Sequence, residues 1–165
     1  MNIKSYLIDT HLLYWWMIQS PKLGKATIQK LRDSDILVST ASLWEMVLKN
    51  HKGKLSLPDE PLHYAISAQG FRILPITPSH LEALRGLGLP HEDPFDRLLL
   101  ATAIAEDCIL LTRDSALLSF FLPFVEPGLL RPSKFEGHCP MIRHGCRMAL
   151  MAALNWSVEC VKEES

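Results

Sequence analysis

Short apolar runs alternate along the chain with longer segments whose apolar positions recur at helical spacing. The short runs are typical of buried strands and fall at residues 6–8, 36–39, 71–74 and 109–112, with a weaker candidate at 123–126. Because helical segments separate the runs, the pattern predicts an α/β fold with a parallel sheet and helices on both faces. In such sheets, ligands bind at the carboxyl ends of the strands.

Capping and turn residues indicate where the helices begin and end. Asp9 is a helix-start signal, Ser42 is suited to cap a later helix, and Gly70 is suited to end one. Asp93 and Pro94 form a strong start, because Asp suits the N-cap and Pro the first helical position. The expected helices span about residues 10–18, 23–31, 42 to between 49 and 53, 62–69, 78–87 and 93–106.

Composition limits the classes of protein to which the chain can belong. With 165 residues it is expected to form one domain and to bury roughly 70% of the surface that the unfolded chain exposes. A net charge of -1 argues against a strongly basic nucleic-acid binder, so any contact with nucleic acid is expected to be local. The N-terminal apolar run is too short for a secretory signal, and no later run would span a bilayer. We therefore expect a cytoplasmic protein with no membrane segment.

A change in composition near residue 127 indicates a boundary, because proline and glycine become frequent there. We place one domain at residues 1–126 and an atypical C-terminal extension at residues 127–165. Apolar residues at 150, 154, 158 and 161 recur at helical spacing, which is consistent with one amphipathic helix in the extension. The histidine and cysteine residues of the extension match no common zinc site.

Four acidic residues occur where an α/β fold brings distant segments together. Asp9 and Asp114 follow the first and fourth expected strands, Glu45 lies in an apolar helical stretch, and Asp96 lies in the first turn of a helix. Each alone has a structural explanation as a cap, a turn residue or a solvated edge. Together they would repel one another unless a cation were bound, and hard divalent cations prefer oxygen ligands. The set therefore predicts a Mg²⁺ or Mn²⁺ site that activates water for phosphodiester hydrolysis.

The same segments carry a family resemblance. They read Leu7-Ile8-Asp9-Thr10-His11, Val38-Ser39 through Leu43-Trp44-Glu45, His91-Glu92-Asp93-Pro94-Phe95-Asp96-Arg97-Leu98-Leu99 and Leu110-Leu111-Thr112-Arg113-Asp114. Each motif alone is weak, but the ordered set across residues 3–125 is specific. It resembles the PIN-domain ribonucleases, in particular the VapC-type toxins of bacterial toxin–antitoxin systems.

The resemblance implies a PIN-like three-layer fold and an Mg²⁺-dependent endoribonuclease, with Mn²⁺ as an alternative cofactor. Asp9 and Asp96 would be the principal metal ligands. Glu45 and Asp114 would complete the catalytic site directly or through water. The implied partners are an RNA substrate, a cognate antitoxin that lies across the active-site groove, and a second copy of the chain in a homodimer.

Several residues near the acids have simpler explanations. The resemblance implies that Thr10 and Thr112 orient waters or metal ligands. Roles as a helix cap and as a strand-end residue explain the two threonines equally well. The N-cap role is sufficient for Asp93, which we leave outside the site. The histidines are dispersed without paired-ligand spacing, so we do not expect histidine chemistry.

Basic and aromatic residues near the same segments could contact RNA. The basic cluster after the helix with Glu45 is suited to backbone phosphates, although a solvated helix end explains it as well; it consists of Lys49, His51, Lys52 and Lys54. The aromatic residues could stack on bases, but we expect them to pack in the core; they are Tyr14, Trp15, Trp16 and Trp44.

Two other functional classes, phosphate-handling proteins and non-catalytic modules, also place acids in an α/β fold. A phosphatase of the haloacid-dehalogenase type would need a second Asp two residues after Asp9, where the sequence has His11, and a receiver domain would need paired acids near the N-terminus. A non-catalytic PIN-like interaction or RNA-binding module is the main alternative. Metal-dependent cleavage of RNA distinguishes it from a nuclease.

Overall fold

The computed structural model describes residues 5–88, 91–119 and 124–128 of the chain. Five strands lie at its centre. They are β1 (Ser5–Ile8), β2 (Asp35–Ser39), β3 (Arg72–Leu74), β4 (Ile109–Thr112) and β5 (Val125–Pro127).

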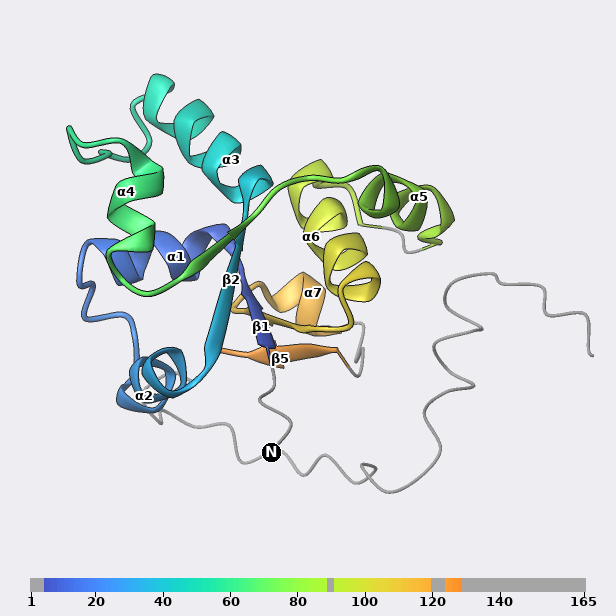
Figure 1. Ribbon diagram of the computed structural model, residues 1–165, viewed down its shortest axis with the longest axis horizontal. Helices are drawn as coiled ribbons and strands as arrows, with labels where there is room; N and C mark the ends of the chain where they lie inside the picture. The colour runs from blue at the N-terminus through green and yellow to red at the C-terminus, as the bar shows by residue number, and fades with distance from the viewer. Residues whose placement is uncertain (1–4, 89–90, 120–123, 129–165) are drawn as a thin grey trace, which may run out of the picture.

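These strands form one parallel sheet with the order β3-β2-β1-β4-β5 (Figure 1). Leu7 of the central strand β1 is in register with Leu37 of β2 on one side and Leu110 of β4 on the other. The chain adds β2 and β3 on one side and then crosses to add β4 and β5 on the other. The strand order therefore reverses between β1 and β4, and α/β proteins bind ligands in the crevice at such a reversal.

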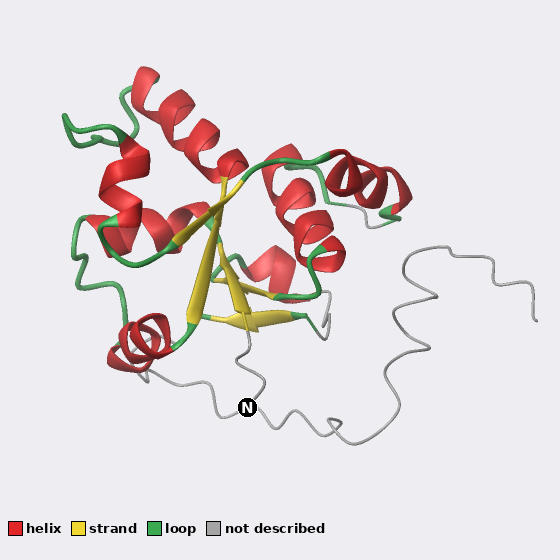
Figure 2. Cartoon of the chain, in the orientation of Figure 1, coloured by secondary structure: helices red, strands yellow, loops and turns green. Residues whose placement is uncertain are grey.

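Helices cover both faces of the sheet and produce three layers (Figure 2). The helices are α1 (Thr10–Met17), α2 (Lys25–Asp33), α3 (Thr40–His51), α4 (Leu62–Ser67), α5 (Pro78–Gly86), α6 (Pro94–Ala105) and α7 (Ser115–Ser119). Because successive strand residues point to opposite faces, Ile8 packs in one core with Leu12 of α1 and Leu31 of α2. Leu7 packs in the second core with Leu99 of α6 and Leu117 of α7.

The structure confirms the predicted α/β class, the parallel sheet and the helices on both faces. The weaker strand candidate is real, although β5 begins two residues later than the pattern indicated. The short helix α7 was not expected. The predicted cap at Ser42 is wrong, because β2 runs directly into α3 and the last strand residue, Ser39, is the N-cap.

The geometry at this junction explains the difference. The hydroxyl of Ser39 accepts a hydrogen bond from the amide of Ala41 at 3.1 Å, as an N-cap should. Ser42 instead lies inside the helix, where its buried hydroxyl has no hydrogen-bond partner within the described residues. Because β2 continues into α3 without a loop, the helix cap lies three residues earlier than predicted.

The C-terminal extension and its expected amphipathic helix lie outside the described residues, apart from Pro127 and Gly128. Pro127 is the last residue of β5, and the amide of Gly128 donates to the carbonyl of Thr112 at 2.7 Å. The domain boundary after residue 126 stays a prediction. No helix in the described part of the chain is long and apolar enough to cross a membrane.

A substitution at Gly128 tests how tightly the end of β5 packs against α1. A Cβ atom added there would lie 2.8 Å from Cδ1 of Leu12, which is fully buried and has little room to move. Overpacking of this kind costs about 1–3 kcal/mol. We expect Gly128→Ala to lower the free energy of unfolding by that amount, measured by urea denaturation. Gly86→Ala, where nothing lies within 4 Å of the added atom, is the control, and equal stability of the two variants would contradict this account.

Candidate functional site

Asp9 lies immediately after β1 and caps α1. Its Oδ1 accepts a hydrogen bond from the amide of Leu12 at 2.7 Å. Its Oδ2 accepts one from the hydroxyl of Thr112 and another from the amide of Arg113 at 3.2 Å. Burial raises the pKa of Asp9, and these three hydrogen bonds oppose that rise. The carboxylate is thus fixed by neutral donors at the reversal of the strand order.

Glu45 lies on the buried side of α3, with only 8% of its surface exposed. One carboxylate oxygen accepts a hydrogen bond from the hydroxyl of Thr10 at 2.5 Å. The other forms an ion pair with the ammonium of Lys49, one helical turn later, at 2.6 Å. A buried glutamate needs a charge partner or a proton, and Lys49 provides the former.

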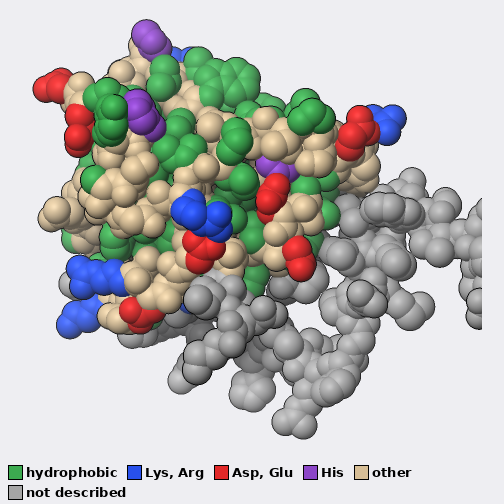
Figure 3. Space-filling model, in the orientation of Figure 1, with side chains coloured by type: hydrophobic (Ala, Val, Ile, Leu, Met, Phe, Trp, Pro, Cys, Tyr) green, Lys and Arg blue, Asp and Glu red, His purple; other side chains and the backbone are tan. Residues whose placement is uncertain are grey.

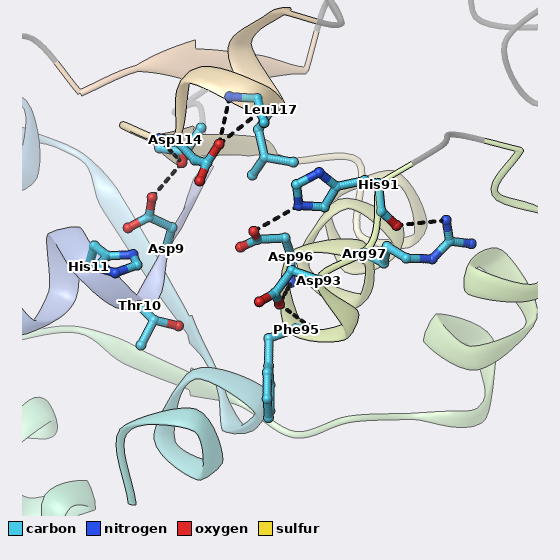
Figure 4. Close-up of polar contacts among 12 residues, drawn as sticks. Asp9, Thr10, His11, His91, Asp93, Phe95, Asp96, Arg97, Asp114 and Leu117 are labelled. Carbon is cyan, nitrogen blue, oxygen red and sulfur yellow. Dashed lines mark hydrogen bonds and ion pairs between the residues drawn. The ribbon is translucent and has the colours of Figure 1, made fainter. Parts of the chain in front are cut away.

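Asp96 lies in the first turn of α6, whose position is set by Asp93 and Pro94. The side chain of Asp93 accepts hydrogen bonds from the amides of Phe95 and Asp96, at 2.9 and 3.2 Å. The cap expected at Asp93 is therefore confirmed. In Figure 4, Asp96 lies at the start of α6 with its carboxylate on the side of Asp9 and Asp114.

The carboxylate of Asp96 contacts a histidine. Its Oδ2 lies 2.9 Å from Nε2 of His91. Burial raises the pKa of Asp96, the hydrogen bond with His91 opposes the rise, and the negative charges of Asp93 and Asp114 add to it. The effect of Asp114 shows that two of the four predicted acids are close enough to interact electrostatically.

Asp114 follows β4 and caps α7. Its Oδ1 accepts hydrogen bonds from the amides of Ala116 at 2.6 Å and Leu117 at 3.2 Å. The hydroxyl of Thr112 accepts a hydrogen bond from the amide of Asp114 at 3.0 Å while it donates to Asp9. Thr112 therefore joins two of the acids, and Thr10 holds a third, Glu45.

The carboxylates of Asp9, Asp96 and Asp114 turn toward one space between the starts of α1, α6 and α7 (Figure 4). Within the described residues, however, no three Asp, Glu, His or Cys side chains are grouped closely enough to form a ready metal-binding cluster. The donor chemistry still suits a hard divalent cation, because such cations prefer oxygen ligands and the acids are carboxylates.

The structure changes the interpretation of two neighbouring residues. Lys49, which the sequence assigned to a basic surface cluster, is instead paired with Glu45 and lies 3.4 Å from Nε2 of His11. His91 contacts Asp96 even though the histidine spacing gave no such signal. Lys49 had a usable signal, because Glu and Lys four residues apart on a helix form ion pairs.

The aromatic residues divide into two groups. Tyr14, Trp15 and Trp16 are partly buried against the core, as expected. Trp44 is 56% exposed, so its expected place in the core is wrong. It packs edge-on against Phe95 at a ring-centre distance of 5.1 Å, between α3 and α6.

Comparison with known proteins identifies relatives of the chain. The family model described as PIN domain matches residues 6–120. Ribonuclease VapC22 of Mycobacterium tuberculosis is 33% identical over 118 residues, which cover 68% of this chain and 89% of that protein.

Solved structures share the fold at lower identity. VapBC2 from Rickettsia felis, bound to a DNA fragment from its promoter, matches with a TM-score of 0.54 and 18% identity over 74% of this chain and 98% of that chain. A toxin–antitoxin complex from Klebsiella pneumoniae matches with a TM-score of 0.54 and 20% identity over 76% of this chain and 99% of that chain. At these identities the structures establish the fold alone.

The raised pKa of Asp96 predicts how the stability of the metal-free protein varies with pH. The folded state binds this proton more tightly than the unfolded chain, so the stability contributed by the protonated form is present near pH 4 and is lost as pH rises through the folded pKa. We expect Asp96→Asn to raise the melting temperature at pH 7.5 and to have little effect near pH 4.

Thermal unfolding in EDTA at the two pH values measures this effect. Asp59→Asn is the control, because Asp59 is exposed in a loop and the substitution changes the net charge equally. A lower melting temperature for Asp96→Asn at pH 7.5 would mean that the buried charge of Asp96 does not destabilise the folded protein.

Proposed function

This chain belongs to the PIN-domain family, and from that premise we propose that it is a divalent-metal-dependent endoribonuclease, the toxin of a toxin–antitoxin pair. The observation that carries the proposal is the placement of Asp9, Asp96 and Asp114 around one space at the carboxyl end of the sheet. Its substrate would be RNA, since the relative at 33% identity is named a ribonuclease.

Asp9 and Asp96 would hold the metal, Mg²⁺ or Mn²⁺, and Asp114 and Glu45 would complete the site directly or through water. When bound, such a metal polarises a phosphate oxygen and lowers the pKa of a coordinated water, which supplies a nucleophile at neutral pH. Both ions accept carboxylate oxygens, so the residues do not favour one of them.

The other residues of the site would keep these carboxylates in position. Leu12, Thr112 and Arg113 donate three hydrogen bonds that leave Asp9 little freedom to rotate. His91 directs one oxygen of Asp96. Residues that orient metal ligands matter for activity nearly as much as the ligands, because a small displacement weakens binding.

An antitoxin partner is supported by apolar surface on the side of the sheet covered by α1 and α4. A cavity of about 320 Å³ there is lined mainly by Tyr14 and Met17 of α1, by Ile18 directly after it, by residues 56–58 and 60, and by Ala65 of α4. Ile18 is 51% exposed, although it is a large apolar residue. Exposed apolar surface beside a cavity is typical of a protein-binding site. A homodimer and a cytoplasmic location stay predictions.

A non-catalytic RNA-binding or interaction module is the second candidate function. Two observations favour it: Lys49 already neutralises Glu45, and the described acids form no ready cluster of three ligands. A nuclease would have to accommodate its metal by small side-chain movements. Hydrolysis assays decide between the two candidates.

We expect the purified chain to cleave single-stranded RNA with Mg²⁺ or Mn²⁺ and to lose that activity in EDTA. Asp96→Asn should lower the rate by at least about 100-fold, because it removes one ligand charge from the metal and its activated water. Mapping of cut ends in a mixed RNA pool measures the activity, and Asp59→Asn is the control. Undiminished cleavage by Asp96→Asn would refute the site, and RNA binding without cleavage by the unmodified chain would support the module.

A further inference from the structure

Two cations lie over one aromatic ring beside the acids. The guanidinium carbon of Arg113 is 4.8 Å from the ring centre of Trp15, and the ammonium nitrogen of Lys22 is 5.3 Å from it. Attraction between a cation and an indole ring holds each of them there. Trp15, Lys22 and Arg113, here called the cation rim, come from α1, the loop after it and the end of β4.

The rim adjoins the acidic site through the backbone. The amide of Arg113 donates to Asp9, so its side chain leaves the chain directly beside that carboxylate. His11 and Trp15 are one turn apart on α1, with ring centres 6.3 Å apart. His11 lies next to Asp9 in Figure 4, so the rim continues outward from the acids along α1.

The two rim cations have no carboxylate partner among the residues that the structure describes. By contrast, Lys30, Arg72 and Arg85 are each paired with an acid. Because both rim charges lie near the same ring centre, they are within roughly 10 Å of each other, about one Debye length at 0.1 M salt. Their mutual repulsion would be relieved by an anion bound between or beside them.

We propose that the cation rim binds backbone phosphates of a single-stranded RNA whose scissile bond lies at the acids. The proposal rests on the proposed function and adds the path of the substrate. Proteins that bind single strands combine a positively charged path with aromatic side chains. In this chain the ring of Trp15 would act as a platform for the cations, because cations lie over it and it is partly buried.

The distribution of charge over the surface favours such a local path. On the face shown in Figure 3, lysine and arginine side chains occur in separate small groups. The net charge of -1 leaves no general attraction for a polyanion, so a few placed cations have to provide it. The large apolar side chains that are exposed lie outside the rim, which argues against an apolar protein partner there; they are Ile18, Trp44, Val47, Tyr64 and Leu81.

The first test compares two double variants that change the net charge equally. Lys22→Gln with Arg113→Gln removes the rim charges, and Arg32→Gln with Arg85→Gln removes two cations elsewhere on the surface. Binding of a labelled oligouridine is measured by fluorescence anisotropy in EDTA at several salt concentrations. Loss of two phosphate contacts should reduce the slope of log K against log salt by about 1.4 and lower the affinity on the order of tenfold at 0.1 M salt.

The control double variant should bind as the unmodified protein does. Oligothymidine should lose affinity by the same factor as oligouridine in the rim variant, because phosphate contacts do not read the 2′-hydroxyl. Unchanged binding of oligouridine by the rim variant would overturn the proposal. The proposal would also be overturned if the rim variant lost affinity for a polyglutamate peptide but not for the oligonucleotides. The rim would then bind an acidic protein segment.

The Trp15→Leu variant distinguishes the contribution of the aromatic ring to RNA binding from that of the two charges. It keeps both cations but removes the ring that holds them, so we expect a loss of affinity of about two- to fivefold with nearly the same salt slope. Circular dichroism and thermal unfolding verify that each variant is folded, and unchanged affinity of a folded Trp15→Leu protein would remove the platform role.

Cleavage in Mg²⁺ is measured separately on the same proteins. If the unmodified chain binds RNA without cleaving it and the rim variant loses that binding, the RNA-binding role of the rim is supported and the nuclease activity is refuted. If the unmodified chain cleaves RNA and the rim variant binds RNA normally, the nuclease activity is supported and the role of the rim is refuted.

Discussion

The burial of a charged carboxylate at the end of the central strand is the constraint on which the site depends. Asp9 is only 3% exposed, and a buried carboxylate is costly unless donors surround it. Its three hydrogen bonds come from α1 and from the end of β4. These bonds lock β1, α1 and β4 together where the strand order reverses. They also fix Thr112, through which Asp114 is placed, and the backbone from which the side chain of Arg113 extends.

Groups of the chain itself stabilise each acid of the site without a metal. Asp9 and Asp114 accept hydrogen bonds from neutral donors, Glu45 is paired with Lys49, and Asp96 contacts His91. This explains how a fold can keep several carboxylates near one space. The pKa of Asp96 is nevertheless raised, first by burial and to a smaller extent by the charges of Asp93 and Asp114.

The elements and the acids could be predicted because their signals are local. Apolar runs located the strands, and the Asp93-Pro94 pair located α6 and therefore Asp96. The sequence did not reveal the contact of His91 with Asp96, because the loop before a helix has no periodicity from which contacts follow. Trp44 was misplaced because a large apolar residue on a buried helix is usually in the core, whereas here it packs on Phe95 and remains exposed. The cap predicted at Ser42 failed for another reason: Ser39 ends β2 and caps α3 at once, so no loop marks the start of the helix.

The structural and functional explanations of the acids turn out to be compatible. The sequence offered helix capping as an alternative to a metal site, yet Asp9 caps α1, Asp114 caps α7, and Asp96 lies in the first turn of α6. The start of a helix carries unpaired amides and a partial positive charge, which stabilise a carboxylate there. Helix starts meeting at one end of the sheet can thus hold acids that would otherwise repel one another. The same partial charges would favour the phosphate of an incoming substrate, so capping is part of how such a site is built.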